Sequence, residues 1–504
     1  MQEKPLNNLP VTYSRNKEIL TILLMSCIAG VIVALSMNIK ESNVVLIIGG
    51  IIGTSLILWS IKSPEFSIYL LFILALFRFR VPTGSISSLS SAQLWLAIIT
   101  IGCFFSMLIS SKRKTVLDIE LLMGLFIIWA LFTLYQSIDF SYGLKQLILW
   151  ALLASSFWVA KRNIRDKHSV QIVLYLFMAL GIFVVLTGIM QFIASAYFGI
   201  DKVTSFISQK IMPLFSSEAT LKYKEASIEL RHKYSNWDIP GSNMMRLISI
   251  FFSPITAGTF LGMTTSVSLA LVVTKKKNWW FRLLFATLAA GVILTFTRGA
   301  YVTLAITLTT IIFIQRERKL RTLVSIAFAF IILVAVFLVF SLNDAVTERA
   351  FATKGGSYTS LKTRSEFLMQ GITIMCDHPI KGVGFANYRS YVKGDTADMS
   401  GINIYPHNQY VQLGAEVGLV GVIFFIAMIA FVLMKSYKVL KKSQDNFTRT
   451  IATASFGAVL FYAIHAMFED IIWIPEIMIP LWIMASLPFI IEKINSTETQ
   501  KKFL

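Results

Sequence analysis

The chain has 504 residues, of which 56% are hydrophobic and only 14% are charged. A soluble globular domain carries about 25% charged residues, so this chain has too few charges to cover a water-exposed surface. Its apolar residues come in blocks long enough to cross a bilayer, and such blocks satisfy their backbone polar groups in lipid as helices. The net charge of +19 therefore indicates cytoplasmic loops rich in Lys and Arg rather than nucleic-acid binding. Three cysteines without a C-x-x-C pair indicate no disulfide framework and no metal site.

Taken in chain order, the apolar blocks predict an all-α polytopic membrane protein with about fourteen transmembrane helices. The predicted spans are 19–37, 44–62, 66–79, 93–110, 118–137, 143–160, 170–197, 246–273, 279–297, 299–315, 322–342, 409–434, 450–468 and 473–491. Basic clusters fall on alternate loops, so the excess of Lys and Arg places both termini in the cytoplasm.

This topology divides the chain into seven parts. They are a cytoplasmic tail (1–18), N-terminal helices (19–198), an extracytoplasmic loop (199–245), helices with the Arg298 turn (246–342), a large extracytoplasmic catalytic loop (343–408), C-terminal helices (409–491) and a second cytoplasmic tail (492–504).

The large loop contains one segment with helical spacing. Its apolar positions are Leu361, Leu368, Ile372 and Met375, and Arg364 shares their face. An unpaired charge on an apolar helical face is costly, so Arg364 is an unexpected residue at this position. The glycines after this segment, in Gly382-Val383-Gly384, predict a turn.

Arg298 occupies a very short predicted turn, Thr297-Arg298-Gly299, between two apolar helices on the outer side. Held there at the depth of the lipid headgroups, its fork of donors suits a pair of phosphate oxygens. The alternative is an interfacial anchor that extends its charge to water. Arg246 opens the predicted span 246–273 on the same side, and its position alone favours such an anchor over a ligand contact.

His407 lies in the segment Tyr405-Pro406-His407-Asn408-Gln409-Tyr410, at the outer entry to the span 409–434. Pro406 precedes the helix and Asn408 is a good N-cap, so the imidazole is fixed at the outer surface. It can take a proton from a hydroxyl near neutral pH, or it can be a structural residue that caps or packs. Glu416 and His465 lie inside spans, where function and interhelical hydrogen bonding are equally good explanations. We find no metal-binding or nucleotide-binding motif and predict no cofactor.

Four segments resemble the O-antigen ligase and polymerase-like superfamily of bacterial envelope proteins. The resemblance covers roughly residues 246–470 and rests on the Arg298-Gly299 turn, 377–387, 406–412 and 416–421. It implies a metal-independent glycosyltransferase of GT-C architecture in the bacterial cytoplasmic membrane. It further implies an undecaprenyl-diphosphate-linked glycan as donor and a hydroxyl as acceptor. By the same resemblance His407 is the general base, Arg298, Arg364 and Arg246 bind the diphosphate, and the supporting residues are His378, Asn408, Tyr410 and Glu416.

Polymerase and ligase share this chemistry and differ in the acceptor. The composition, rich in Lys, Ile, Phe and Ser, is typical of an AT-rich genome, and a host without an outer membrane favours a polymerase of repeat units. A chain-length regulator is then a candidate partner. The alternative is a ligase that transfers the finished glycan to a lipid or a protein. A polysaccharide transporter or flippase is a further alternative. It is disfavoured because the candidate charges gather at the outer surface instead of the membrane midplane.

Overall fold

The computed structural model describes residues 55–56, 58–60, 62–77, 90–109, 119–211, 237, 239, 244–274, 278–314, 356–395 and 405–503. The predicted spans 19–37 and 322–342, and much of 44–62, lie outside these residues. The chain forms two compact units, Met1–Leu70 and Leu71–Leu504, and all of the site residues belong to the second. In the first unit the rings of Trp59 and Phe66 stack with their centroids 4.2 Å apart.

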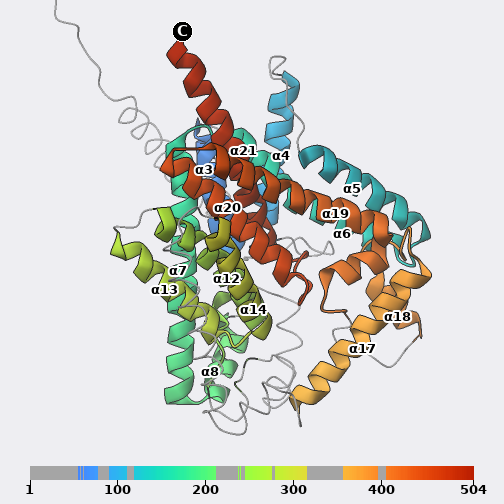
Figure 1. Ribbon diagram of the computed structural model, residues 1–504. Helices are drawn as coiled ribbons and strands as arrows, with labels where there is room; N and C mark the ends of the chain where they lie inside the picture. Colours follow the sequence, from blue (N-terminus) through green and yellow to red (C-terminus); the bar gives the residue numbers. More distant parts are fainter. Residues whose placement is uncertain are drawn as a thin grey trace, which may run out of the picture. The chain divides into compact units, whose positions relative to one another are not determined.

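The described residues form helices and no β-strand (Figure 1). The longer elements are α3 (Pro64–Leu76), α4 (Ser91–Ile109), α5 (Ile119–Thr133), α6 (Phe140–Asn163), α7 (Lys167–Phe198), α12 (Pro254–Thr274), α13 (Trp279–Leu294), α14 (Arg298–Ile314), α17 (Gly356–Asp377), α19 (Gln409–Lys442), α20 (Asn446–His465) and α21 (Pro475–Phe503). Shorter ones are α8 (Ile200–Phe206), α18 (Tyr388–Asp395), the 3-10 turns η1 (Leu134–Gln136) and η3 (Ser249–Phe251), and the π-helical turn η2 (Ile207–Ile211).

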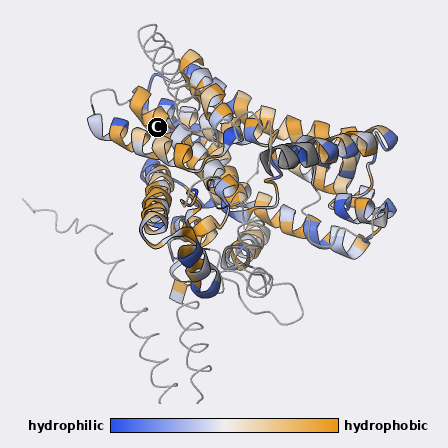
Figure 2. Ribbon diagram, turned by 90° about the horizontal axis from the view of Figure 1, so that it is seen from below, coloured by the Kyte–Doolittle hydropathy of each residue, from blue (hydrophilic) through white to orange (hydrophobic). Residues whose placement is uncertain are grey.

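Seven of the described helical segments are long and apolar enough to cross a membrane. They are α5 with η1, α6, α7, α12, α19, α20 and α21. Figure 2 shows that hydrophobic residues are frequent along the described helices. The apolar helices α3, α4, α13 and α14 are not among the seven. The prediction of an all-helical, multi-pass membrane protein is confirmed, while fourteen spans and the GT-C architecture remain predictions.

Helix α12 is the centre of the second unit, because it packs against α20, α13, α7 and α14 and nearly all of its residues are buried. Its many hydroxyls donate to main-chain carbonyls of the same helix, as Ser266 does to Gly262 at 2.8 Å, so they add no orphan donors to an apolar core. At Gly262 a Cβ would lie only 1.9 Å from the ring of Phe461, so this glycine allows α12 and α20 to approach closely.

Helix α12 begins at Pro254, and the predicted span 246–273 was wrong at its start. Pro254 has no N–H to donate back and disfavours a helical residue before it, so the helix starts there. Phe252 has a φ of 53°, in the left-handed region. Arg246 consequently does not open a helix; its main-chain N–H donates to the carbonyl of Trp237 at 2.6 Å.

Helix α19 is broken at Gly418, whose φ of 67° and ψ of −179° are not helical. The break frees carbonyl groups in the preceding turn, and other parts of the chain satisfy them. Val383 and Gly384 donate their N–H groups to the carbonyls of residues 415 and 416, each at 2.8 Å. The indole of Trp129 donates to the carbonyl of residue 417 at 2.9 Å. A side chain at Gly418 is excluded, because its Cβ would lie 2.0 Å from the carbonyl oxygen of Ile380.

Candidate functional site

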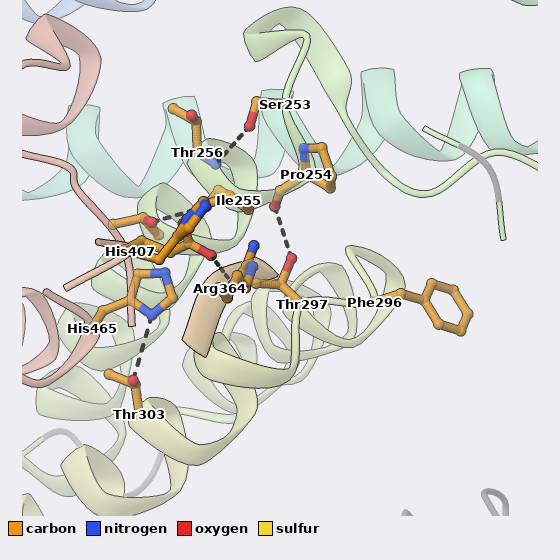
Figure 3. Close-up of polar contacts among 12 residues, drawn as sticks. Ser253, Pro254, Ile255, Thr256, Phe296, Thr297, Thr303, Arg364, His407 and His465 are labelled. Carbon is orange, nitrogen blue, oxygen red and sulfur yellow. Dashed lines mark hydrogen bonds and ion pairs between the residues drawn. The ribbon is translucent and has the colours of Figure 1, made fainter. Parts of the chain in front are cut away.

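The site is assembled from four elements that lie far apart in the sequence. Arg298 is the first residue of α14, Arg364 lies on α17, His407 immediately precedes the N-cap of α19, and Glu469 follows the end of α20. Figure 3 shows His407, Arg364 and Thr297 close together, with His465 beside them. The three residues predicted to carry the chemistry therefore come from separate elements that meet at one place.

Glu469 links the predicted base to one of the predicted diphosphate ligands. One oxygen of its carboxylate accepts a hydrogen bond from Nη1 of Arg364 at 2.9 Å, and the other lies 3.1 Å from Nδ1 of His407. The Glu469 side chain is only 9% exposed. Burial raises the pKa of this carboxyl, but the hydrogen bond to His407 and the charge of Arg364 outweigh burial and hold the pKa below its ordinary value.

This contact fixes the tautomer of His407. An ionised carboxylate can only accept a hydrogen bond, so Nδ1 of the imidazole must carry the proton that it shares with Glu469. In the neutral ring, Nε2 then has a free lone pair. The arrangement prepares Nε2 to accept a proton, as the carboxylate of a catalytic triad does for its histidine.

The backbone around His407 holds the ring in place. His407 has a φ of 50°, a left-handed conformation that side-chain-bearing residues rarely adopt. The side chain of Asn408 accepts from the N–H groups of Tyr410 and Val411, both at 3.1 Å, so the predicted N-cap is confirmed. The N–H of Gln409 donates to the carbonyl of Ala466 at 2.9 Å. These bonds join the start of α19 to the end of α20, next to Glu469.

Arg298 lies at the tight turn between α13 and α14, as its sequence position predicts. The adjacent Gly299 faces the α20 end, because its Cβ would lie 3.4 Å from the His465 ring and 3.1 Å from Phe468. Partial burial lowers the pKa of the Arg298 guanidinium, and the nearby positive charge of Arg364 lowers it further. The two guanidinium groups are thus close enough to repel each other, which favours an anion between them.

Arg246 is buried against the turn between α13 and α14. Its guanidinium donates to the carbonyls of Thr295 and Phe296, each at 2.9 Å, and to the hydroxyl of Thr297 at 3.3 Å. The Thr297 hydroxyl in turn lies 3.1 Å from the carbonyl of Pro254, at the start of α12. These contacts place Arg246 as a buried support for the turn that presents Arg298.

Arg364 lies on the buried face of α17, although the face differs slightly from the predicted one. The buried residues are Phe367 and Ile374, with Gly371 between them, whereas the predicted Leu368, Ile372 and Met375 are half-buried. Arg364 shares a face with the buried set, at spacings of three, seven and ten residues. The charge that looked misplaced in the sequence has Glu469 as its partner.

The four predicted supporting residues contribute to the framework. Tyr410 donates its hydroxyl to the carbonyl of Ala463 at 2.7 Å and so joins α19 to α20. Nε2 of His378 lies 3.3 Å from the hydroxyl of Tyr391, and this contact joins the end of α17 to α18. Asn408 is the N-cap described above. Glu416 is fully buried in α19 and accepts the N–H of Ala386 at 3.0 Å.

The loop between α17 and α18 is also anchored by the N-terminal half of the chain. Asn387 pairs with Asp139 twice: its amide oxygen accepts the Asp139 N–H at 2.8 Å, and its amide nitrogen donates to the Asp139 carbonyl at 3.2 Å. Gln136 donates to the carbonyl of Gly382. The turn between α5 and α6 therefore holds the loop that follows α17.

Glu469 and its neighbour Asp470 were missing from the predicted site. The available signal was a pair of acidic residues at the outer end of a predicted span, where charges are rare unless they have a role. Burial raises the pKa of Asp470 to about 7, and the negative charges of Glu469 and Glu416 act in the same direction.

Part of the sequence matches known proteins and a known family model. Residues 283–426 match the O-antigen ligase family model. This segment contains Arg298, Arg364 and His407 but ends before Glu469. A protein of Rickettsia felis named "Putative polysaccharide ligase" is 27% identical over 123 residues, which are 23% of this chain and 28% of that protein. A protein of Rickettsia conorii with the same description is 25% identical over 125 residues, again 23% of this chain and 28% of the relative. The chain thus spans little more than a quarter of the curated relatives it matches, and its residues 283–426 confirm the resemblance to the O-antigen ligase superfamily.

Proposed function

We propose that this protein is a membrane glycosyltransferase that transfers a glycan from a polyprenyl diphosphate to an acceptor hydroxyl. The observation that carries the proposal is the Glu469 carboxylate, which contacts both His407 and Arg364 while Arg298 lies near Arg364. This reaction has two requirements. It needs a base that is prepared to take a proton, and it needs a pair of guanidinium groups that favour an anion.

In the proposed reaction Nε2 of His407 removes the proton of the acceptor hydroxyl as its oxygen attacks the anomeric carbon. The bond from that carbon to the diphosphate oxygen breaks, and its electron pair leaves with the diphosphate. Negative charge therefore grows on the leaving group, where Arg298 and Arg364 stabilise the transition state more than the ground state. Direct attack of this kind inverts the configuration at the anomeric carbon.

Binding of the donor also changes the interaction between Glu469 and His407. A diphosphate that arrives at Arg298 and Arg364 competes with Glu469 for the Arg364 guanidinium. Glu469 then directs more of its negative charge to Nδ1 of His407, where it stabilises the imidazolium that forms when Nε2 takes the proton. The base would thus be activated when the donor is in place.

The acceptor favoured by the comparisons is that of a ligase. The matching family is described as O-antigen ligase and both relatives carry polysaccharide-ligase names, whereas the composition alone favoured a polymerase. We therefore propose transfer of a finished glycan to a lipid or protein on the outer face of the cytoplasmic membrane. Both chain termini would then lie in the cytoplasm, as the basic loops predict.

The test replaces His407 in the native host and examines both the surface glycan and the lipid-linked pool. His407→Ala is expected to abolish surface glycan at unchanged protein level, while long glycans accumulate on the polyprenyl diphosphate. Accumulation of single repeat units instead would identify a polymerase. His168→Ala, an exposed histidine in the first turn of α7, is the matched control. Normal surface glycan in His407→Ala cells would refute the role of the base.

A further inference from the structure

Two buried polar atoms, one beside Glu469 and one at the start of α18, have no hydrogen-bond partner in the part of the chain that the structure describes. Nε of Arg389 and Oδ1 of Asp470 are both buried, and neither has a hydrogen-bond partner among the residues that the structure describes. Leaving a charged group's donor or acceptor unpaired in a protein costs several times the net value of an ordinary hydrogen bond. A pair of such atoms with complementary character, one donor and one acceptor, calls for a ligand that supplies both.

The fold places Asp470 beside the base, and it places Arg389 at the start of α18. Asp470 is adjacent to Glu469, and its carboxylate interacts with the main-chain N–H of His407. Arg389 is the second residue of α18, immediately after the loop that Glu416 and the turn before α6 hold in position. The loop is rigid at this point, because Asn387 pairs with Asp139 through two hydrogen bonds.

Two tyrosines complete the cluster. Tyr405 lies two residues before His407, and Tyr142 lies in the first turn of α6. Burial raises the pKa of Tyr405 to about 12, and its other determinants include the charges of Glu416, Arg389 and Asp470 and the phenol of Tyr142. Each of those groups consequently lies within electrostatic reach of Tyr405. Tyr142 is 40% exposed and Tyr405 is half-buried, so the cluster is reached from outside.

We propose that Arg389, Asp470, Tyr405 and Tyr142 form a subsite for a sugar ring of the acceptor, and that this subsite presents the acceptor hydroxyl to His407. The proposal rests on the glycosyl transfer proposed above. It extends that function by assigning the acceptor site to residues on the Asp470 side of His407, apart from the Arg364 contact.

The chemistry of the cluster fits a neutral sugar better than a second anion. Arg389 offers only donors, the carboxyl of Asp470 offers acceptor oxygens, and the phenols offer both. This combination suits neighbouring hydroxyl groups of a sugar, which both donate and accept hydrogen bonds. The acidic side chains of Asp470 and Glu416 offer no positive charge to a phosphate, in contrast to the doubly positive environment at Arg298 and Arg364. The aromatic rings provide apolar surface for the C–H face of a sugar ring.

The test measures the binding of two probes to the full-length protein in detergent or nanodiscs. Methyl glycosides of common neutral hexoses and N-acetylhexosamines report on the proposed subsite, and inorganic pyrophosphate reports on the two arginines. Arg389→Gln and Asp470→Asn are each expected to weaken glycoside binding about tenfold or more, because each loses a hydrogen bond involving a charged group. Pyrophosphate binding should be unchanged in both variants. Arg298→Ala should show the reverse pattern.

The outcomes separate the subsite from the proposed function. The subsite is refuted if wild-type protein binds pyrophosphate but no glycoside, or if the two variants bind glycosides as well as wild type does. If the wild-type protein binds glycosides, the two variants do not, and the wild-type protein does not bind pyrophosphate, then the subsite stands and the diphosphate role fails. Arg162→Gln, at the opposite end of α6 from Tyr142, is the matched control. Tyr405→Phe removes a single hydroxyl and is a second, milder variant should Arg389→Gln prove unstable.

Discussion

Replacing Glu469 with glutamine should disable the protein with almost no change in shape. The glutamine keeps an oxygen for Arg364 but offers an NH2 group to Nδ1 of His407, which must then accept. The ring proton moves to Nε2, and the lone pair that would take the acceptor proton is lost. In the Ser-His-Asp triad the corresponding Asp-to-Asn change lowers kcat by about 10⁴.

The magnitude here follows from the two contacts of Glu469. Loss of the correct tautomer alone removes base catalysis, worth about 10²–10⁴ in rate. At Arg364 the amide oxygen of the glutamine still accepts a hydrogen bond from the guanidinium, so this contact adds little to the loss. We expect a loss of about 10²–10⁴, which is about 2.7–5.4 kcal/mol in the activation free energy.

The assay is the initial rate of glycan transfer in membranes that contain equal amounts of variant and wild-type protein. The control is Glu492→Gln, which also breaks an ion pair, that of Glu492 with Lys435, but far along α21 from the site. A Glu469→Gln variant that keeps more than about a tenth of the wild-type rate would refute the tautomer argument.

Three further predictions test the arginine, the helix break and the buried acid. Arg298→Lys should lower transfer about 100-fold in the same membrane assay, because an ammonium cannot bind two phosphate oxygens as a guanidinium fork does; full activity would reduce Arg298 to an interfacial anchor. Gly418→Ala should prevent stable folding, seen as loss of the protein in detergent size-exclusion, because its Cβ would lie 2.0 Å from the carbonyl oxygen of Ile380; matched Gly102→Ala, with open space around it, should be tolerated. The pKa of Asp470 is about 7 in the folded protein and about 3.9 in the unfolded chain. As the pH rises between these two values, the unfolded chain loses this proton before the folded protein does, so the stability of the wild-type protein falls. Asp470→Asn should therefore gain thermal stability over wild type between pH 5 and 8, and a difference independent of pH would contradict the buried carboxyl.

The local signals in the sequence located most of the helices and part of the site. Apolar block length placed the membrane helices in the described residues, and helical spacing placed the segment that contains Arg364. The N-cap signal at Asn408 and the short turn at Arg298 were also read from neighbouring residues. Each of these features depends on interactions within a few residues, which is the range over which sequence pattern carries information.

Features that depend on distant residues were missed. Glu469 lies 62 residues from His407 and 105 from Arg364, and no local pattern joins them. The docking of Asp139 on Asn387 spans 248 residues, so the N-terminal half looked like a plain set of helices. The break in α19 was hidden because Gly418 lies within a predicted span and the groups that satisfy the freed carbonyls come from α5 and the loop after α17.

A double variant makes the Glu469 argument sharper, because Glu469 serves two partners. If its main role is to orient His407, then Glu469→Gln added to His407→Ala should cause no further loss, since the base is already gone. If its main role is to hold Arg364 toward the diphosphate, the loss should add to that of His407→Ala. The hydrogen-bond geometry favours the first outcome, because His407 depends on Glu469 for its tautomer, whereas the Arg364 guanidinium, 34% exposed, remains free to turn toward an anion. Additive losses would transfer the role of Glu469 from the base to the donor site.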